Sequence, residues 1–322
     1  MPEGDTIHRV ANVLRRALAG RTVTGFEIVA PRMSSDAARF EVVGSVVRAV
    51  ESNGKHLLIT FARGDDEVVL HTHMKMTGAW HVYRPGERWW SPRSDARVVI
   101  TTDEFVAPCF TPPVVELMTT KEIAFHAVLP DLGPDIIRDE FDEEEAVRRV
   151  RASPPERDIA TALLDQRTIS GIGNVFKCEA LFLERVSPWA KVAELDDATL
   201  RRLVVQARKL MRLNRGGGER RTRFALNAAE GMWVDERTGL PCHVCGTAVA
   251  WGYHPNEFRK SWYCPRCQNV KWAPTTTEGL ARLSGAEVRG PAGADEEVSD
   301  SAWRSSRTPA ERSSASRADQ PR

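Results

Sequence analysis

Four cysteines stand in two closely spaced pairs in the last third of the sequence. Cys242 and Cys245 form the first Cys-x-x-Cys pair, Cys264 and Cys267 form the second, and 18 residues separate the pairs. This spacing is typical of a four-cysteine zinc ribbon, in which each pair makes a tight turn that supplies two thiolates. Four protein ligands leave no coordination position open for a substrate. The spacing therefore predicts one Zn²⁺ with a structural role.

The N-terminus is the second place where the residue types can do chemistry. Removal of Met1 before the small residue Pro2 exposes a secondary amine. A terminal α-amino group titrates near ~8, against ~10.4 for lysine, so far more of it is neutral and nucleophilic at neutral pH. Attack of this amine on a sugar C1′ gives an iminium ion that accepts electrons, and Glu3 is placed to exchange protons. Taken alone, the pair is weak evidence, because many proteins begin this way without such chemistry.

A glycine-rich turn lies between two helical patterns. Gly171 and Gly173 allow the backbone to approach a ligand closely, and Asn174 is expected at the N-cap of the next helix. One interpretation is simply a turn followed by a capped helix. The other adds a phosphate held at the helix N-terminus by backbone N–H groups and the asparagine side chain. The two interpretations are compatible.

Two cations and two histidines complete the candidate residues. Lys55 follows an Asn-Gly turn, and Arg259 lies between the two cysteine pairs. Each is an ordinary surface cation when taken alone, but a rigid turn can direct its charge at a phosphate. His71 and His73 would share one face of a strand, where no third ligand is evident, so we expect no metal there.

The elements that must position these residues change in type along the chain. A helix is expected over 5–19, ending before Gly20, and strands follow from 22 to about 115. Residues 46–61 read as a hairpin with Asn53-Gly54 as its turn. Further helices are expected at 142–151, 156–166, 174–185 and 196–213.

This organisation predicts an α+β protein with five parts. Residues 1–126 form an N-terminal β-sandwich flanked by helices, and residues 127–138 form a linker containing prolines and a glycine. A helical domain over 139–223 and a zinc-finger β-hairpin module over 224–272 follow. Residues 273–322 are polar and rich in proline, alanine and serine, so we expect a disordered tail.

Charge is unevenly distributed along the 322 residues, although the net charge is only +1. Residues 1–150 carry 18 basic and 23 acidic side chains, whereas residues 151–271 carry 20 and 13. The basic excess is concentrated in the run from Arg201 to Arg223. This run is either a solvated helix face or a surface for a polyanion.

The remaining features argue against a membrane-spanning protein and against a secreted one. No apolar run reaches the ~18 residues that a membrane span needs, and the first residues do not form a signal peptide, so we expect a cytoplasmic protein. Cys109 and Cys178 are expected to be buried as small apolar residues.

Together these residues resemble the formamidopyrimidine-DNA glycosylase/endonuclease VIII family over about residues 2–270. The motifs are Pro-Glu-Gly at the N-terminus, Gly-Lys-His-Leu-Leu from Gly54 and Leu-Gly-Pro-Asp from Leu132. They continue with Leu-Leu-Asp-Gln from Leu163, Gly-Ile-Gly-Asn from Gly171, Glu-Ala-Leu from Glu179 and the four cysteines. The resemblance implies a β-sandwich joined to a helix–two-turn–helix domain with a zinc finger, and damaged DNA bound between them.

The resemblance also implies roles for individual residues. Pro2 would be the nucleophile, Glu3 would protonate the opening sugar ring, and Lys55, Asn174 and Arg259 would hold the phosphates around a flipped-out nucleotide. We also place Arg157, Gly171 and Gly173 among the DNA-binding residues. Successive β- and δ-elimination would then leave a one-nucleotide gap.

Flipping a nucleotide leaves a hole in the duplex that an apolar side chain fills. Met76 aligns with the first of the family's wedge residues, and the alternative is a core methionine on a strand. The family's Asp-Pro-Arg-Arg-Phe-Gly segment has no match in the corresponding residues 102–110, so no further wedge residue is assigned. The missing arginine pair and the Pro-Glu-Gly start favour the endonuclease VIII branch.

We therefore expect a monomeric, nucleoid-associated DNA glycosylase and apurinic/apyrimidinic lyase of base excision repair that acts on oxidised pyrimidines. The substrate would be duplex DNA, or DNA with single-stranded or bubble character. Two alternatives remain at this point: an 8-oxoguanine or formamidopyrimidine glycosylase of the same family, and a damage-binding protein without the chemistry.

Overall fold

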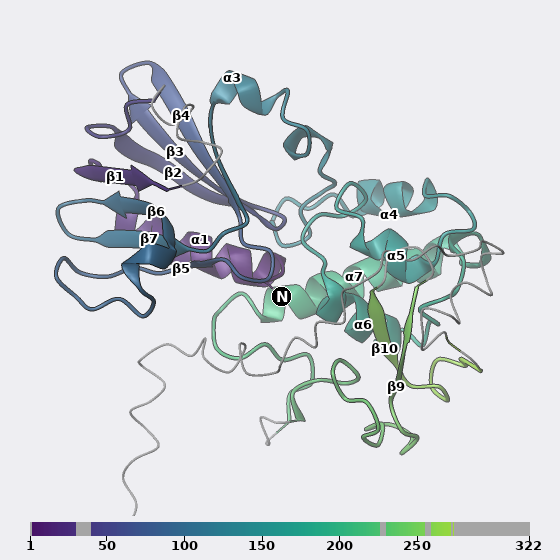
Figure 1. Ribbon diagram of the computed structural model, residues 1–322. Helices are drawn as coiled ribbons and strands as arrows, with labels where there is room; N and C mark the ends of the chain where they lie inside the picture. The colour runs from purple at the N-terminus through teal and green to yellow at the C-terminus, as the bar shows by residue number, and fades with distance from the viewer. Residues whose placement is uncertain (1, 30–39, 226–229, 255–258, 272, 274–322) are drawn as a thin grey trace, which may run out of the picture. The chain divides into compact units, whose positions relative to one another are not determined.

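The computed structural model describes residues 2–29, 40–225, 230–254, 259–271 and 273, and the elements below belong to these ranges (Figure 1). The expected disordered tail lies outside the described residues except for Ala273. Among the helices described, none is long and apolar enough to cross a membrane.

The first helix follows the N-terminus directly and contacts strand β2 and helix α7. Helix α1 spans Gly4–Leu18 and buries one apolar face that includes Ile7, Ala11 and Leu14. It ends before Gly20, whose φ of +77° is a left-handed conformation that glycine adopts without strain. The buried face of α1 packs on strand β2, so the N-terminal residues are fixed relative to the sheets.

Two antiparallel four-stranded sheets follow, in the orders β1-β6-β7-β5 and β2-β3-β4-β8. Valine, isoleucine and leucine side chains from the sheets and from α1 share one core, as expected for a sandwich. The strands are β1 (Gly25–Ile28), β2 (Val46–Asn53), β3 (His56–Arg63), β4 (Asp66–His73), β5 (Ala79–Trp80), β6 (Ala96–Thr101), β7 (Val106–Phe110) and β8 (Val114–Thr119).

The β2–β3 hairpin confirms the turn expected at Asn53-Gly54. Asn53 pairs with His56, and Gly54 has a φ of +59°. A Cβ atom on Gly54 would lie 2.7 Å from the side chain of Ser170, so only glycine fits where this hairpin tip meets the helical region. Lys55 therefore sits on a turn that is pressed against another part of the chain.

The helical region has its own apolar core. Its α-helices are α4 (Glu143–Arg151), α5 (Ile159–Leu164), α6 (Asn174–Leu183) and α7 (Asp197–Leu213). Helix α3 (Thr120–Ile123) instead packs on β8 and β4, and short 3₁₀ turns lie at Arg93–Asp95, Leu129–Asp131 and Val192–Glu194. Asp142 caps α4 and Asp196 caps α7, each accepting the N–H three residues later. Helix α5 is shorter than expected from its apolar pattern, because the chain enters it through Asp158 in an extended conformation.

The last two strands form the hairpin between the cysteine pairs. Strands β9 (Ala250–Tyr253) and β10 (Lys260–Tyr263) are antiparallel, with Trp251 opposite Trp262. The cysteines pack with α6 through Cys178 and Phe182, so the hairpin is joined to the helical region by a small apolar cluster. The fold class is therefore the expected one: two β-sheets, a helical region and a cysteine-bearing hairpin.

Candidate active site

The carboxylate of Glu3 lies at the N-terminus of α6. It is fully buried, and it accepts hydrogen bonds from the backbone N–H groups of Gly173 and Val175 at 2.9 Å and of Phe176 at 3.5 Å. A carboxylate is stabilised at this end of a helix by the free N–H groups and the helix dipole. Glu3 therefore occupies three of the N–H groups at the helix end where the sequence predicted a phosphate, and the phosphate contact of Asn174 stays a prediction.

The glycine-rich turn is shaped to receive the N-terminal residues. Gly4 donates its N–H to the carbonyl of Gly171 at 3.0 Å, and Gly171 has a φ of +101°. A Cβ atom on Gly173 would lie 2.3 Å from Glu3, so the carboxylate requires glycine there. Pro2 is half-buried directly before Glu3. The sequence-predicted residues Pro2, Glu3, Gly171 and Gly173 therefore come together in one place.

Lys55 belongs to the same place. Its side chain is only 9% exposed, which the expectation of a surface cation did not anticipate. Burial lowers the pKa of Lys55 to about 8, while the charge of Glu3 raises it and those of Arg259 and Arg220 lower it further. Lys55 thus interacts electrostatically with the carboxylate of Glu3 and with two further cations, Arg259 and Arg220. The excess of positive charge favours an anionic ligand.

Arg220 was not singled out from the sequence, although it lies within the basic run. Its guanidinium donates to both carboxylate oxygens of Asp5, at 3.1 and 2.7 Å, and its Nη1 lies 3.9 Å from Glu3 Oε1. The same group covers the ring of Phe176, 5.1 Å from the centroid. Arg220 thus joins the segment after α7 to the start of α1 beside the catalytic candidates.

Asn174 is the first residue of α6, and Gly173 occupies the N-cap. The expected N-cap role of Asn174 is therefore wrong by one residue. Its side-chain Oδ1 accepts a hydrogen bond from Lys177 Nζ at 2.7 Å. Arg259, just before β10, is exposed, and its charge helps to lower the pKa of Lys55.

Met76 is exposed and Met74 is buried, so the core interpretation is wrong for Met76. The side chain of Met76 is 67% exposed in the turn between β4 and β5. Thr77, next to it, exchanges two hydrogen bonds with Thr111, at 3.0 and 2.9 Å. The β7–β8 connection, which contains Thr111, therefore lies beside the Met76 turn.

Arg157 is engaged within the protein. Its Nη1 donates to Asp165 Oδ2 at 2.9 Å before α5, so its DNA-binding role stays a prediction. The basic run also pairs largely with acidic residues of the chain, which favours the solvated-face interpretation. These pairs are Arg201 with Glu143 and Glu144, Arg202 with Glu184, Arg212 and Arg215 with Asp139, Arg221 with Glu219, and Arg223 with Glu230.

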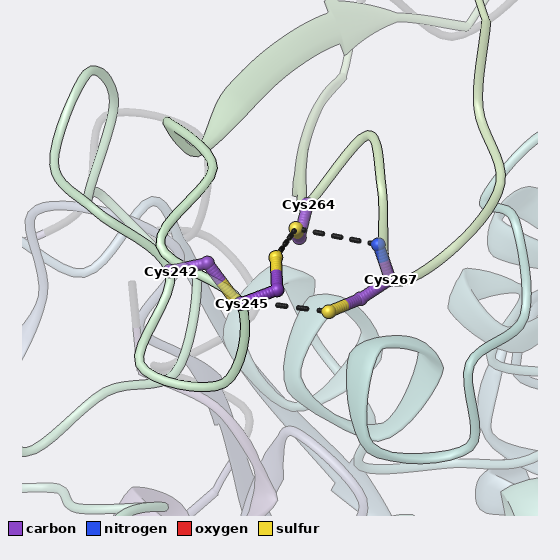
Figure 2. Close-up of side chains that lie close together, drawn as sticks. All are labelled: Cys242, Cys245, Cys264 and Cys267. Carbon is purple, nitrogen blue, oxygen red and sulfur yellow. Dashed lines mark hydrogen bonds between the residues drawn. The ribbon is translucent and has the colours of Figure 1, made fainter.

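The four cysteines turn their sulfur atoms toward one another (Figure 2). Cys242 Sγ lies 3.9 Å from Cys267 Sγ, and Cys245 Sγ lies 3.4 Å from Cys264 Sγ. Tetrahedral Zn–S bonds of about 2.3 Å place sulfur atoms roughly 3.8 Å apart, within the range of these distances. The residues present therefore fit a four-coordinate metal ion. Cys109 and Cys178 are buried as expected, and burial raises the pKa of Cys178 to about 12.

His71 has two further potential metal ligands beside it, Glu116 and His126, which the sequence did not bring into view. Glu116 Oε2 lies 2.7 Å from His71 Nδ1 and 2.9 Å from His126 Nε2. His126 Nδ1 accepts two backbone N–H groups, so Nε2 must carry the ring proton of the neutral imidazole. That proton donates to Glu116, which leaves no lone pair for a metal, and the cluster is a hydrogen-bond network.

Glu179 is another residue whose position the sequence did not explain. It is fully buried on α6 and accepts hydrogen bonds from the backbone N–H groups of Trp233, Val234 and Asp235, each at 2.8 Å, and from the Thr222 hydroxyl. One carboxylate thus fixes the segment that leads into the cysteine cluster.

Comparison with known proteins places this geometry in a family. Residues 1–113 match the formamidopyrimidine-DNA glycosylase N-terminal domain, and residues 132–222 match the formamidopyrimidine-DNA glycosylase H2TH domain. A probable endonuclease 8 2 of Streptomyces coelicolor is 38% identical over a region that covers 83% of this chain and 94% of that protein. The DNA-(apurinic or apyrimidinic site) lyase Nei2 of Mycolicibacterium smegmatis is 34% identical over 84% of this chain and 100% of its own.

Solved structures agree at the level of the fold. A Lactococcus lactis Fpg in complex with abasic-site DNA has a TM-score of 0.69 and 22% identity, over 83% of this chain and 99% of that chain. The resemblance stated from the sequence is therefore confirmed, and the chain belongs to the formamidopyrimidine-DNA glycosylase/endonuclease VIII family.

Proposed function

We propose that this chain is a DNA glycosylase and apurinic/apyrimidinic lyase that removes oxidised pyrimidines from damaged DNA. The observation that carries the proposal is the position of Glu3, buried on the N-terminus of α6 directly after Pro2 and close to Lys55. A binding protein without chemistry has no need for a buried carboxylate beside its terminal amine. The names of the relatives, endonuclease 8 and apurinic or apyrimidinic site lyase, support the same activity.

The reaction begins at the amine of Pro2, once Met1 has been removed. This amine attacks C1′ of the damaged nucleotide, the bond from C1′ to the base breaks, and the base leaves with a proton. Glu3 supplies the proton that opens the sugar ring at O4′, which yields the iminium ion. The iminium acidifies the proton at C2′, whose loss expels the 3′ phosphate, and a second elimination expels the 5′ phosphate.

Holding the flipped nucleotide requires contacts to the DNA backbone on both sides of it. Lys55, Asn174 and Arg259 are the phosphate-holding residues of the proposal, and Met76 fills the space left in the duplex. The glycines of the turn position the N-terminal residues, because Gly171 accepts the N–H of Gly4 and Gly173 leaves room for Glu3. Solved complexes of Lactococcus lactis Fpg contain abasic-site or formamidopyrimidine DNA, which supports damaged DNA as the ligand. Such an enzyme works at the nucleoid.

Zn²⁺ is the ion we propose for the four-cysteine cluster. Four thiolates at tetrahedral spacing favour zinc, and a closed ligand set makes it structural. Cys242, Cys245, Cys264 and Cys267 would hold the ion at the base of the β9–β10 hairpin, which carries Arg259 toward the site. We also retain the division into a sandwich domain (1–126), linker (127–138), helical domain (139–223) and zinc module (224–272) as part of the proposal.

Borohydride trapping on duplexes with single defined lesions tests the proposal. Borohydride reduces the iminium and leaves a covalent protein–DNA adduct, which we expect on thymine glycol, dihydrouracil and abasic sites. An adduct confined to 8-oxoguanine or formamidopyrimidine would move the specificity to the other branch. No adduct on any duplex, with DNA binding intact, would favour a damage-binding protein. The matched variant Pro2→Gly should trap far less while still binding zinc.

A further inference from the structure

A buried lysine lies behind Asn174. Lys177, one turn further along α6, is fully buried, and its ammonium donates to Asn174 Oδ1 at 2.7 Å, Ser261 Oγ at 2.7 Å and the carbonyl of Lys260 at 3.2 Å. An ammonium has three donors, so these three acceptors satisfy it. All three acceptors are uncharged.

The charge of this lysine has no counter-ion in contact within the part of the chain that the structure describes. Among the described residues, no ion pair within 4.0 Å includes Lys177, although buried cations are normally paired. The bonds continue from Ser261 Oγ to His254 Nε2 at 2.7 Å and from His254 Nδ1 to Asp158 Oδ2 at 2.8 Å. Asp158 also binds Lys191 Nζ at 2.7 Å, so that carboxylate already has a cation of its own.

The contact with Lys177 determines which end of the Asn174 amide is available. An amide has one acceptor oxygen and an NH₂ group with two donors. Because the ammonium takes the oxygen, the NH₂ group is the end that remains for a ligand, and a DNA phosphate only accepts hydrogen bonds. The carbonyl that Lys177 binds belongs to Lys260, directly after Arg259, so one ammonium supports two of the three phosphate-holding residues, Asn174 and Arg259.

We propose that Lys177 is a positioning residue for the DNA backbone: it orients Asn174 and supplies the buried positive charge that a DNA phosphate neutralises. This inference rests on the proposed function, because it needs a phosphate at Asn174. It adds a residue that does not itself touch DNA, and it joins the α6 side of the site to the β10 side.

The test uses the full chain and a duplex with a tetrahydrofuran abasic analogue, which binds but forms no iminium. Lys177→Met removes the charge and keeps the length, and Lys209→Met removes an exposed lysine of α7 as the matched control. We expect Lys177→Met to weaken binding roughly ten- to hundred-fold, as for lost charge-assisted hydrogen bonds. The slope of log affinity against log salt concentration should become shallower by up to about 0.9. The affinity of the control should stay within about twofold of the wild type.

A double-mutant cycle separates positioning from a structural role. If Lys177 acts in part through Asn174, adding Lys177→Met to Asn174→Ala should cost clearly less affinity than Lys177→Met costs in the wild type. Fully additive losses, or a Lys177→Met protein that binds like the wild type, would overturn the inference. If Lys177→Met does not fold around zinc, Lys177→Gln carries the same test, because it keeps donors and removes only the charge; it should show the shallower salt dependence.

Borohydride trapping keeps this inference distinct from the proposed function. With saturating abasic-site DNA, trapping by Lys177→Met should fall by less than its affinity does, because Pro2 and Glu3 are unchanged. A wild-type protein that neither binds nor traps abasic DNA would refute the proposed function. A wild type that does both, beside a variant with unchanged affinity and salt dependence, would refute only the role of Lys177.

Discussion

The unusual state of Lys55 makes the affinity for DNA depend on pH in a range where most lysines do not titrate. Lys55 is 9% exposed, and burial lowers its pKa to about 8 from an ordinary value of 10.5, with Glu3 opposing and Arg259 reinforcing the shift. The protonated form is the one that attracts a phosphate. As pH rises through 8, the free protein therefore loses the charge that its ligand needs.

The size of the effect follows from the fraction of Lys55 that is charged. With a pKa of about 8, about 90% is protonated at pH 7 and about 9% at pH 9. If a bound phosphate holds the lysine charged, the observed affinity scales with that fraction. Binding should then weaken about tenfold from pH 7 to pH 9, which corresponds to roughly 1.4 kcal/mol.

Fluorescence anisotropy with the tetrahydrofuran duplex, at constant ionic strength, measures this dependence without any covalent step. Lys55→Arg is the matched control, because arginine stays charged throughout this range. The control should lose little affinity between pH 7 and pH 9. A wild-type affinity that is constant over the range, or an equal tenfold loss in Lys55→Arg, would show that Lys55 is not the titrating group.

Three further outcomes are expected. Glu179→Gln places an amide NH₂ group among the hydrogen-bond donors that surround Glu179. It should therefore lower the free energy of unfolding, measured by denaturant titration, by about 2–4 kcal/mol. A change below about 0.5 kcal/mol would contradict the role of Glu179 as the acceptor for these donors. Chelation should release one Zn²⁺ per chain, measured with a chromogenic dye, and weaken DNA binding; retention of full binding by the metal-free protein would mean that the cluster does not position Arg259. Burial lowers the pKa of His56 to about 3, so its contribution to stability is present above pH 6.5 and is lost as pH falls toward 3. Between these pH values, His56→Gln should reduce the slope of the free energy of unfolding against pH by up to about 1.4 kcal/mol per pH unit. An unchanged slope would show that His56 does not cause this pH dependence.

Local signals explain what the sequence predicted well. The Asn53-Gly54 hairpin, the helix that ends before Gly20 and the cysteine pairs each depend on residues within a few positions of one another. Turn conformation, helix termination and metal-ligand spacing are local properties, so a single sequence carries them.

Contacts between distant residues account for what the sequence did not predict. Glu3 accepts N–H groups about 170 positions away, and Arg220 binds Asp5 across a separation of 215 positions. Neither contact has a local pattern. The buried Lys177 was hidden for the same reason, since its partner Ser261 lies on another element. The run from Arg201 to Arg223 was compatible with a solvated face or a polyanion surface, because its acidic partners, such as Glu144 for Arg201 and Asp139 for Arg212, lie far away in the sequence.

Identification of the residue that carries the trapped DNA tests directly whether the amine of Pro2 is the nucleophile. The wild-type adduct formed with borohydride on abasic-site DNA is digested with protease and nuclease, and the modified peptide is sequenced by mass spectrometry. We expect the sugar remnant to be attached to the amine of Pro2 in a chain that has lost Met1. Attachment to Lys55 or to any other lysine would contradict it.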